Sequence, residues 1–169
     1  MIERLPDGAP VLIRPIRPDD KGMLADGLRR LSPQSAQRRF LTPQRSFSRA
    51  ELRYLTEVDG LDHVAYVAES PSSPTRRLIA VGRFVKLQDD PRAAEVAVTV
   101  ADEWQGRGLG SLLGKHLAHL ARNRDVKRFT ATMASENTPA HRLLAKLTDH
   151  LQQQHVGGGV DELTLDLVA

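Results

Sequence analysis

Hydrophobic and polar residues alternate with a period of two along residues 95–100, where valines occupy positions 96, 98 and 100 and Glu95, Ala97 and Thr99 lie between them. This spacing predicts a β-strand with two unlike faces. From Leu109 onward the apolar residues recur every three or four positions, as on one side of a helix. Glycines at positions 106, 108 and 110 separate the two patterns. The sequence therefore predicts a strand, a glycine-rich turn and a helix, in that order.

The first third of the chain has mainly helical spacing. Residues 11–17 alternate like a strand, which we expect at a sheet edge because Pro15 cannot donate to a ladder. Helices are predicted from Pro18, from the N-cap Ser32 to about Phe40, and from Ser48 to about Val58. The last of these begins with the Ser-x-x-Glu spacing of a capping box.

Strands dominate the rest of the chain. Residues 63–69, 78–87 and the strand with Glu95 are joined by short turns, which predicts an antiparallel meander. A strand at 129–133 follows a helical crossover and should lie parallel to the Glu95 strand. A helix from Thr138 and a hairpin of residues 151–155 and 160–168 complete the order. We expect one α/β domain with a mixed sheet over residues 1–169.

Composition narrows the classes of function. The chain carries a net charge of +3 and no cysteine, so neither disulfides nor a thiol nucleophile is available. No apolar run approaches the roughly 18 residues of a membrane-spanning helix, and the N-terminus does not have a signal-peptide pattern. Two tyrosines, one tryptophan and four phenylalanines leave little for base stacking, so no nucleic-acid partner is expected. A cytoplasmic location is the default expectation.

The glycine-rich turn is suited to an anion, because the free N–H groups and the positive end of the helix dipole face the same point. Its Gly-x-Gly-x-Gly spacing differs from the Gly-x-Gly-x-x-Gly of dinucleotide-binding folds. A Walker A loop is also excluded, since Lys115 is followed by His116. The segment Gln-x-x-Gly-x-Gly at residues 105–110, preceded by the strand from Ala94, resembles the coenzyme A pyrophosphate loop of the GNAT superfamily of acetyl-CoA-dependent N-acetyltransferases.

This resemblance implies a GNAT fold, with a central, mostly antiparallel sheet, helices on both faces, and a splayed parallel strand pair at the cofactor site. Acetyl-CoA would be the cosubstrate, and its pantetheine amides could pair with the strand backbone if the neighbouring strand diverges. The turn would bind the pyrophosphate. The candidate cofactor-binding residues are Val98, Thr99, Val100, Gln105, Gly106, Arg107, Gly108, Leu109, Gly110, Ser111 and Asn137.

Glu95 is the candidate general base. A lysine amine of pKa about 10.4 is almost fully protonated at pH 7, so its attack on a thioester requires a base. Glu95 lies three residues before Val98, close to the expected position of the thioester. Its Ala-Glu-x-Ala-Val strand, like the segments from Arg14 and Leu31, resembles the bacterial protein-lysine acetyltransferases of the Pat type, in which the matching glutamate is the proposed base. The competing interpretation is a solvated carboxylate on the polar face of a strand.

Asn137 lies in an Asn-x-x-Ala element that resembles the one whose asparagine contacts the cofactor in the superfamily, and it is also a candidate N-cap. Beyond this point the sequence departs from the family pattern. The usual tyrosine, which protonates the leaving thiolate, is replaced by Leu144, and Tyr54 and Tyr66 lie far upstream. A thiolate of pKa about 8.5 leaves tolerably without an acid.

Histidines and arginines give weaker signals. His116 and His119 have i, i+3 spacing, but no third ligand has a defined spacing, so no metal site is expected. Arginines are frequent in the segment 29–53, which roofs the acceptor side in the resembling fold. Most are expected on solvated helix faces. If they face the acceptor groove, a lysine flanked by Asp or Glu should be preferred, and salt should weaken the preference.

The sequence thus predicts an N-acetyltransferase that moves an acetyl or short acyl group to a primary amine by direct attack, with Glu95 as base. The Pat-type resemblance favours a protein lysine as the acceptor. Two alternatives stay open: an N-acetyltransferase of a small amine or antibiotic, and an acyl-CoA-binding module without turnover. The acyl chain length and the oligomeric state, a homodimer included, are also open.

Overall fold

The computed structural model describes residues 1–41 and 46–167. Within these ranges eight strands form one sheet in the order β1-β2-β3-β4-β5-β6-β8-β7. The strands are β1 Ile2–Arg4, β2 Pro10–Pro15, β3 His63–Glu69, β4 Leu78–Lys86, β5 Ala93–Val100, β6 Arg128–Ala134, β7 Leu151–Gly157 and β8 Val160–Asp166. The helices are α1 Lys21–Arg30, α2 Pro33–Phe40, α3 Arg49–Thr56, α4 Leu109–Arg122 and α5 Thr138–Ala145, with short 3-10 turns η1 Pro18–Asp20 and η2 Asp102–Trp104.

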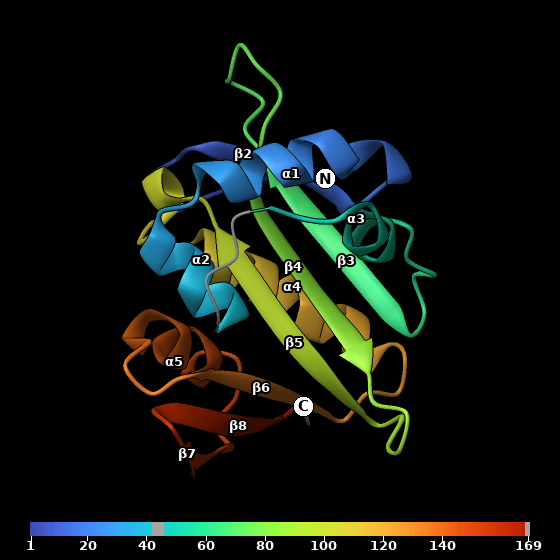
Figure 1. Ribbon diagram of the computed structural model, residues 1–169, viewed down its shortest axis with the longest axis vertical. Helices are drawn as coiled ribbons and strands as arrows, with labels where there is room; N and C mark the ends of the chain where they lie inside the picture. Colours follow the sequence, from blue (N-terminus) through green and yellow to red (C-terminus); the bar gives the residue numbers. More distant parts are fainter. Residues whose placement is uncertain (42–45, 168–169) are drawn as a thin grey trace.

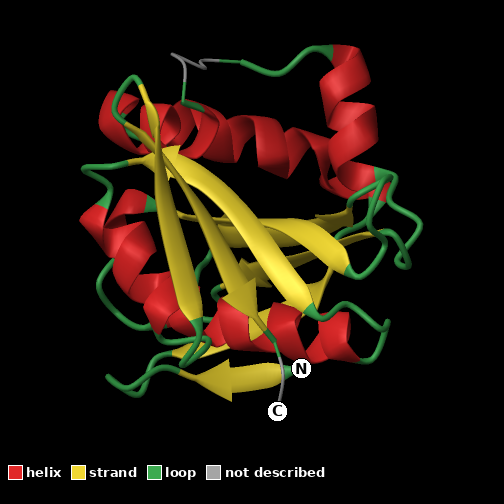
Figure 2. Ribbon diagram, turned by 90° about the horizontal axis from the view of Figure 1, so that it is seen from below, coloured by secondary structure: helices red, strands yellow, loops and turns green. Residues whose placement is uncertain are grey.

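The sheet is mixed and twisted, and helices cover both of its faces (Figure 2). α4 crosses β4 and β5 on one face, with α5 beside it, while α1 and α3 pack together on the opposite face (Figure 1). Strands β3, β4 and β5 pair antiparallel, and β5 pairs parallel with β6. The predicted meander, the parallel pair and the helices on both faces are therefore confirmed.

The strand register divides β4 and β5 into two faces. Arg83 pairs with Ala97 and Val81 with Thr99, so these side chains and that of Glu95 lie on the α1–α3 face. Phe84, Val96 and Val98, which alternate with them, point toward α4 and pack with that helix in the core. The alternation seen in the sequence thus separates an apolar face from a mixed one.

The α4 face is closely packed. Leu109, Leu113 and Leu117 of α4 have no exposed surface, and full burial stabilises each by about 1.5–3 kcal/mol. Gly82 of β4 makes this approach possible. A Cβ atom at this position would lie 2.8 Å from a methyl group of Leu117 and 2.9 Å from Cγ of Leu113. The helix can therefore lie against β4 only because residue 82 has no side chain.

The expected place of residues 11–17 at a sheet edge is wrong. Residues 11–15 belong to β2, and β1 pairs outside it, with Ile2 opposite Leu12 and Arg4 opposite Pro10. Three residues are too few to show alternation, so the sequence pattern missed β1. Pro15 lies beyond this ladder, opposite Tyr66 of β3, so its missing N–H breaks no bond to β1.

The helix boundaries follow the predicted capping residues. The Ser32 hydroxyl accepts a hydrogen bond from the Ser35 N–H at 3.1 Å at the start of α2, and Ser48 accepts one from the Glu51 N–H at 3.1 Å at the start of α3. α3 ends at Thr56, two residues earlier than expected. The hairpin of β7 and β8 is present, and the predicted extension of its second strand to 168 lies outside the described residues.

Candidate active site

A gap opens between β5 and β6. The two strands pair only at residues 93–95 of β5, after which β6 continues along β8. From Val96 to Val100, β5 therefore pairs with β4 alone, and its outward backbone groups face the gap. This is the divergence that the sequence interpretation required for a cofactor strand.

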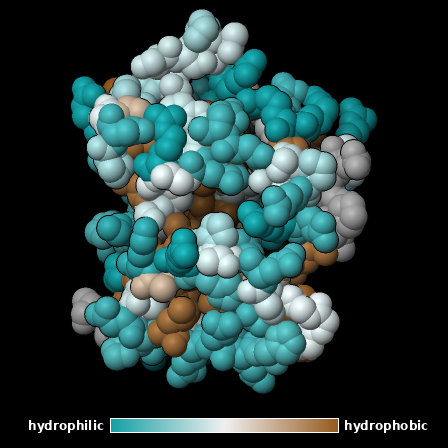
Figure 3. All heavy atoms as spheres, turned by 90° about the vertical axis from the view of Figure 1, so that its left-hand side faces the viewer, coloured by the Kyte–Doolittle hydropathy of each residue, from teal (hydrophilic) through white to brown (hydrophobic). Residues whose placement is uncertain are grey.

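Two hollows follow this gap. The first lies toward the glycine turn and is lined by β5 residues 98–100, Gln105, Gly106 and Gly110. The second contains Glu95. Both hollows are lined by Arg38, Arg39, Val98, Asn137, Ala140 and Leu143. Together they form one groove between α2 and α5, and Figure 3 shows that side of the molecule, with apolar residues recessed among polar ones.

The glycine turn has backbone geometry that only glycine adopts easily. Gly106 has φ +72° and Gly108, the N-cap of α4, has φ +88°. The first N–H groups of α4 have no intrahelical acceptor. Gly110, in this first turn, lines the groove. Gly110 also permits close packing, because a Cβ there would lie 3.3 Å from a methyl group of Leu143.

The polar side chains of the turn have partners within the protein. The amide nitrogen of Gln105 donates to the Val100 carbonyl at 3.0 Å and to the Ser35 hydroxyl at 3.2 Å, which ties the turn to β5 and α2. The Arg107 guanidinium lies 4.2 Å from the ring centroid of Trp104. Its Nε donates to a carboxylate oxygen of Asp7 at 2.7 Å. The expected positive charge of Arg107 is therefore shared with a carboxylate.

The other predicted cofactor residues differ in their positions. Leu109 is fully buried in the core, so only its backbone could contact a ligand. Ser111 lies within the first turn of α4 and does not line the groove. Asn137 is 7% exposed, lines both hollows, and its side-chain oxygen accepts a hydrogen bond from the Ala140 N–H at 3.3 Å. The N-cap interpretation of Asn137 is confirmed.

Glu95 is exposed and faces the second hollow, where Arg38 and Arg39 of α2 lie opposite the strand. Burial lowers the pKa of the Arg39 guanidinium, and the negative charge of Glu95 acts in the opposite direction. Both groups therefore belong to one electrostatic environment. Of the arginines in segment 29–53, these two line the groove, whereas Arg45 lies outside the described residues.

The aromatic and histidine side chains lie elsewhere. Leu144, at the usual tyrosine position, is 4% exposed within the core. Tyr54 packs against His63 with the rings tilted, and Tyr66 meets His116 edge to face with ring centroids 4.6 Å apart. Among the described residues no group of three or more His, Cys, Asp or Glu could hold a metal ion. None of the described helices is long and apolar enough to cross a bilayer.

Sequence reasoning missed Arg83. It lies on β4 next to Ala97, is 6% exposed, and borders a third hollow beside the groove. The signal was a single charge within the otherwise apolar stretch Leu78–Val85. Its position near Glu95 depends on the register of β4 and β5, which the sequence did not reveal.

A splayed parallel pair in a mixed sheet, with a glycine turn at one end of the gap and a carboxylate at the other, defines an acyltransferase of the GNAT architecture. The chain belongs to the acetyltransferase (GNAT) family, whose model matches residues 34–148. It is thus an acetyltransferase by family, as the sequence predicted.

Several relatives support this assignment. The chain is 33% identical over 136 residues to acetyltransferase PA5475 of Pseudomonas aeruginosa, covering 80% of this chain and 73% of the relative. It is 36% identical over 136 residues to acetyltransferase Pat of Mycolicibacterium smegmatis, covering 80% of this chain and 40% of that larger protein. The crystal structure of the GNAT domain of S. lividans PAT superposes with a TM-score of 0.86 at 28% identity, covering 98% and 96% of the two chains.

A further similar structure contains a cofactor. The Salmonella typhimurium acetyltransferase yncA with its cofactor acetyl-CoA superposes with a TM-score of 0.72 at 17% identity, covering 94% of each chain. At this identity the likeness concerns the fold.

Proposed function

We propose that this protein is an acetyl-CoA-dependent N-acetyltransferase that acts on a lysine amine of a protein, with Glu95 as the general base. The observation that carries the proposal is the continuous groove, which joins the glycine turn at residues 105–110 to Glu95 along the free edge of β5. A cosubstrate bound along this edge would place its reactive end beside the carboxylate.

The groove residues fit acetyl-CoA in two respects. The outward backbone groups of β5 between Val96 and Val100 have no neighbouring strand, which suits the two amides of a pantetheine arm. The turn offers free N–H groups and two glycines with positive φ for a pyrophosphate. When bound, acetyl-CoA would supply an acetyl group activated as a thioester. Thr99, Gln105 and Asn137 would line its path.

Glu95 supplies the acid–base step. Its carboxylate takes a proton from the acceptor ammonium, which leaves the nitrogen lone pair free. In the overall reaction a C–N bond forms, a C–S bond breaks, and the products are an amide, coenzyme A and one proton. The exposure of Glu95 allows this proton to pass to solvent.

The protein acceptor is supported by the likeness to Pat acetyltransferases, both in the Glu95 strand and over the compared ranges. The chain spans only 40% of the mycobacterial Pat protein. The acceptor of that larger protein is therefore not carried over, and a protein lysine is proposed separately for this chain. The groove is open to solvent at Glu95, which suits a lysine presented on a protein surface.

The test uses radiolabelled acetyl-CoA with a bacterial protein extract and, in parallel, with a panel of polyamines and aminoglycosides. We expect the wild type to label proteins and Glu95→Gln to label none. Fast turnover of one small amine, without protein label above the uncatalysed background, would favour a small-molecule acetyltransferase. Stabilisation by acetyl-CoA without turnover of any amine would favour a binding module.

A further inference from the structure

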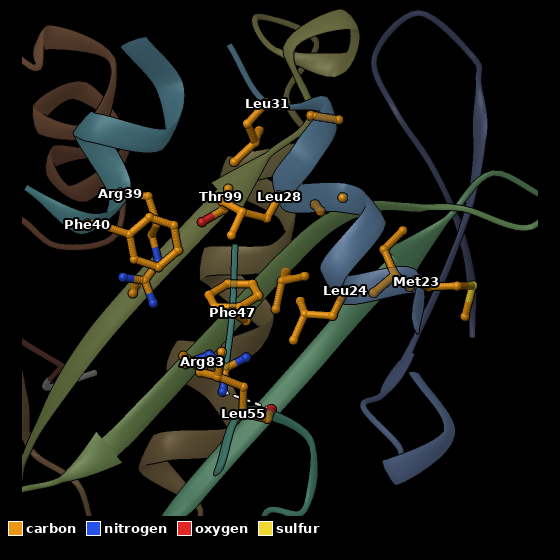
Figure 4. A pocket seen from close by; sticks show the side chains of 16 residues that line it. Met23, Leu24, Leu28, Leu31, Arg39, Phe40, Phe47, Leu55, Arg83 and Thr99 are labelled. Carbon is orange, nitrogen blue, oxygen red and sulfur yellow. Dashed lines mark hydrogen bonds between the residues drawn. The ribbon is translucent and has the colours of Figure 1, made fainter. Parts of the chain in front are cut away.

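A third hollow, here called the side pocket, opens beside the groove on the α1–α3 face (Figure 4). Arg39, Phe40 and Ala97 line both the side pocket and the hollow that contains Glu95. Its walls are mostly apolar and come from α1, from α3 and from the strands beneath, with Leu24, Leu28, Leu31, Phe47, Leu55 and Leu78 among them. The side pocket is therefore a branch of the groove at the candidate base.

Arg83 borders this apolar space with an incompletely bonded guanidinium group. Its Nη1 donates to the Leu55 carbonyl at 3.0 Å and to Nε2 of His63 at 3.0 Å (Figure 4 shows the first of these bonds). His63 accepts because burial, and then the charge of Arg83, lower its pKa to about 4 and keep it neutral at pH 7. Among the described residues, Nε and Nη2 of Arg83 have no hydrogen-bond partner.

The same protein shows how a buried arginine is ordinarily neutralised. Arg14 is 7% exposed and binds both oxygens of Asp20 at 2.8 Å and a carboxylate oxygen of Glu69 at 2.8 Å. Arg83 is 6% exposed, and no carboxylate among the described residues pairs with it. A buried charge without a counter-ion is strongly unfavourable. Among the described residues Arg83 thus lacks the negative partner that Arg14 has, and a bound anion would supply it.

Arg39 places a second positive charge at the same pocket. Burial lowers the pKa of Arg83 to about 10, and the charge of Arg39 acts in the same direction. Both guanidinium groups stay protonated near neutral pH. In Figure 4, Arg39 comes from α2 and Arg83 from β4, and both border the pocket. An anion near both groups would relieve their mutual repulsion.

We propose that Arg83 and Arg39 bind a carboxylate that the acceptor carries close to its amine, and that the side pocket receives the apolar carbons beside this carboxylate. The position of the amine at Glu95 rests on the proposed function, whereas binding of the carboxylate does not. Two sources share this chemistry: an acidic side chain near the target lysine of a protein, and the carboxylate of a free amino acid.

The first experiment needs no turnover. Calorimetric titration compares 4-methylpentanoate with 4-methylpentanamide, which has the same shape without the charge. The acid should bind wild-type protein roughly 10- to 100-fold more tightly than the amide, and Arg83→Gln should remove this difference. Arg77→Gln removes the same charge from an exposed site and should keep it. Equal binding of acid and amide to the wild type would overturn the proposal.

The second experiment measures acetylation of blocked peptides that contain one lysine and either Glu or Gln at the same position, scanned over about three residues on each side. A Glu peptide should have roughly 10-fold higher kcat/KM through a lower KM, and Arg83→Gln should abolish the preference. The preference should persist between about 0.05 and 0.5 M salt, because Arg83 is buried. Loss of the preference in Arg77→Gln would instead indicate general surface attraction.

A parallel arm compares leucine with leucinamide. Faster acetylation of leucine, with no preference among the peptides, would assign the carboxylate to a free amino acid. Absence of all turnover, with selective binding of 4-methylpentanoate retained, would reject the acetyltransferase proposal and leave the carboxylate site standing. If Arg83→Gln does not fold, Arg83→Met, whose unbranched apolar side chain removes the charge without adding a polar group, serves in its place.

Discussion

Strands β4 and β5 lie between two unlike regions of the molecule. On the α4 face, Gly82, Phe84 and Val96 pack against a helix whose Leu113 and Leu117 have no exposed surface. On the opposite face the same two strands carry Arg83 and Glu95 along open hollows. Residues that are neighbours in the sequence thus have different tasks. The face that a residue occupies, more than its place in the chain, should decide whether its substitution affects stability or chemistry.

The largest effect, on turnover, is expected from a substitution on the α1–α3 face. Glu95→Gln should lower turnover at pH 7 by about 10²- to 10⁴-fold, because an amide cannot take the proton from the acceptor. The loss should shrink as the pH approaches the pKa of the acceptor amine, where the amine is already neutral. Steady-state rates over a range of pH, together with thermal stabilisation by acetyl-CoA, measure the two properties separately.

Glu162→Gln is the matched control, since it makes the same change at an exposed position of β8. Its turnover should equal that of the wild type. Normal turnover of Glu95→Gln at pH 7 would place the base elsewhere, and the comparison between the two faces would lose its chemical part.

Acid should lower the stability of the folded protein through His63. Burial, and then the charge of Arg83, lower its pKa in the folded protein from 6.5 to about 4, with Asp59 opposing. Between these two pH values the unfolded chain binds a proton that the native protein does not. The free energy of unfolding should therefore fall as the pH drops from 6.5 to 4, by up to about 3 kcal/mol.

Urea unfolding at several pH values tests this effect. His63→Gln should lose less stability than the wild type over the same interval, whereas His150→Gln, at an exposed position, should lose as much. Equal acid sensitivity of wild type and His63→Gln would mean that the charged imidazole is tolerated beside Arg83.

The elements of the fold were largely predictable because their signals are local. The alternation in β5 and the N-caps Ser32 and Ser48 depend on residues a few positions apart. β1 was not predictable, since three residues acquire their structure only by pairing with β2. This also explains why β2 was wrongly expected at the edge.

The candidate site was predictable only in part. The strand and turn motifs pointed to Val98, Gln105 and Glu95, which line one groove, although their roles stay predictions. The sequence did not reveal that Arg83 and Arg39 meet at a branch of that groove. Their proximity depends on the register of β4 against β5 and on the packing of α2, and both are tertiary features.

The glycine turn offers a test at the junction of the two regions. Acetyl-CoA at about 100 times its Kd should stabilise the wild type by about 2.7 kcal/mol. Gly110→Val should lose this stabilisation, because position 110 lines the groove and a Cβ there already lies 3.3 Å from Leu143 and 3.6 Å from Val100. Thermal unfolding with and without acetyl-CoA gives the shift.

Gly108→Val should lose the shift as well, with added strain because Gly108 has φ +88°. Gly22→Val places the same side chain in a helix where nothing lies within 4 Å of the new Cβ, and should keep the full shift. A full shift in both turn variants would remove the turn from the cofactor site.

The smallest effect is expected from a substitution on the α4 face. Gly82→Ala should lower the free energy of unfolding by about 1–3 kcal/mol, because the new methyl group would lie within 3 Å of Leu113 and Leu117 and force α4 away from β4. Gly22→Ala adds the same group to α1, where it meets open space, and should raise stability by about 0.5–1 kcal/mol. Chemical denaturation measures both changes. Because α4 begins at the glycine turn, Gly82→Ala should also weaken stabilisation by acetyl-CoA. A variant that keeps both its stability and its response to acetyl-CoA would show that the packing between α4 and β4 can accommodate a methyl group.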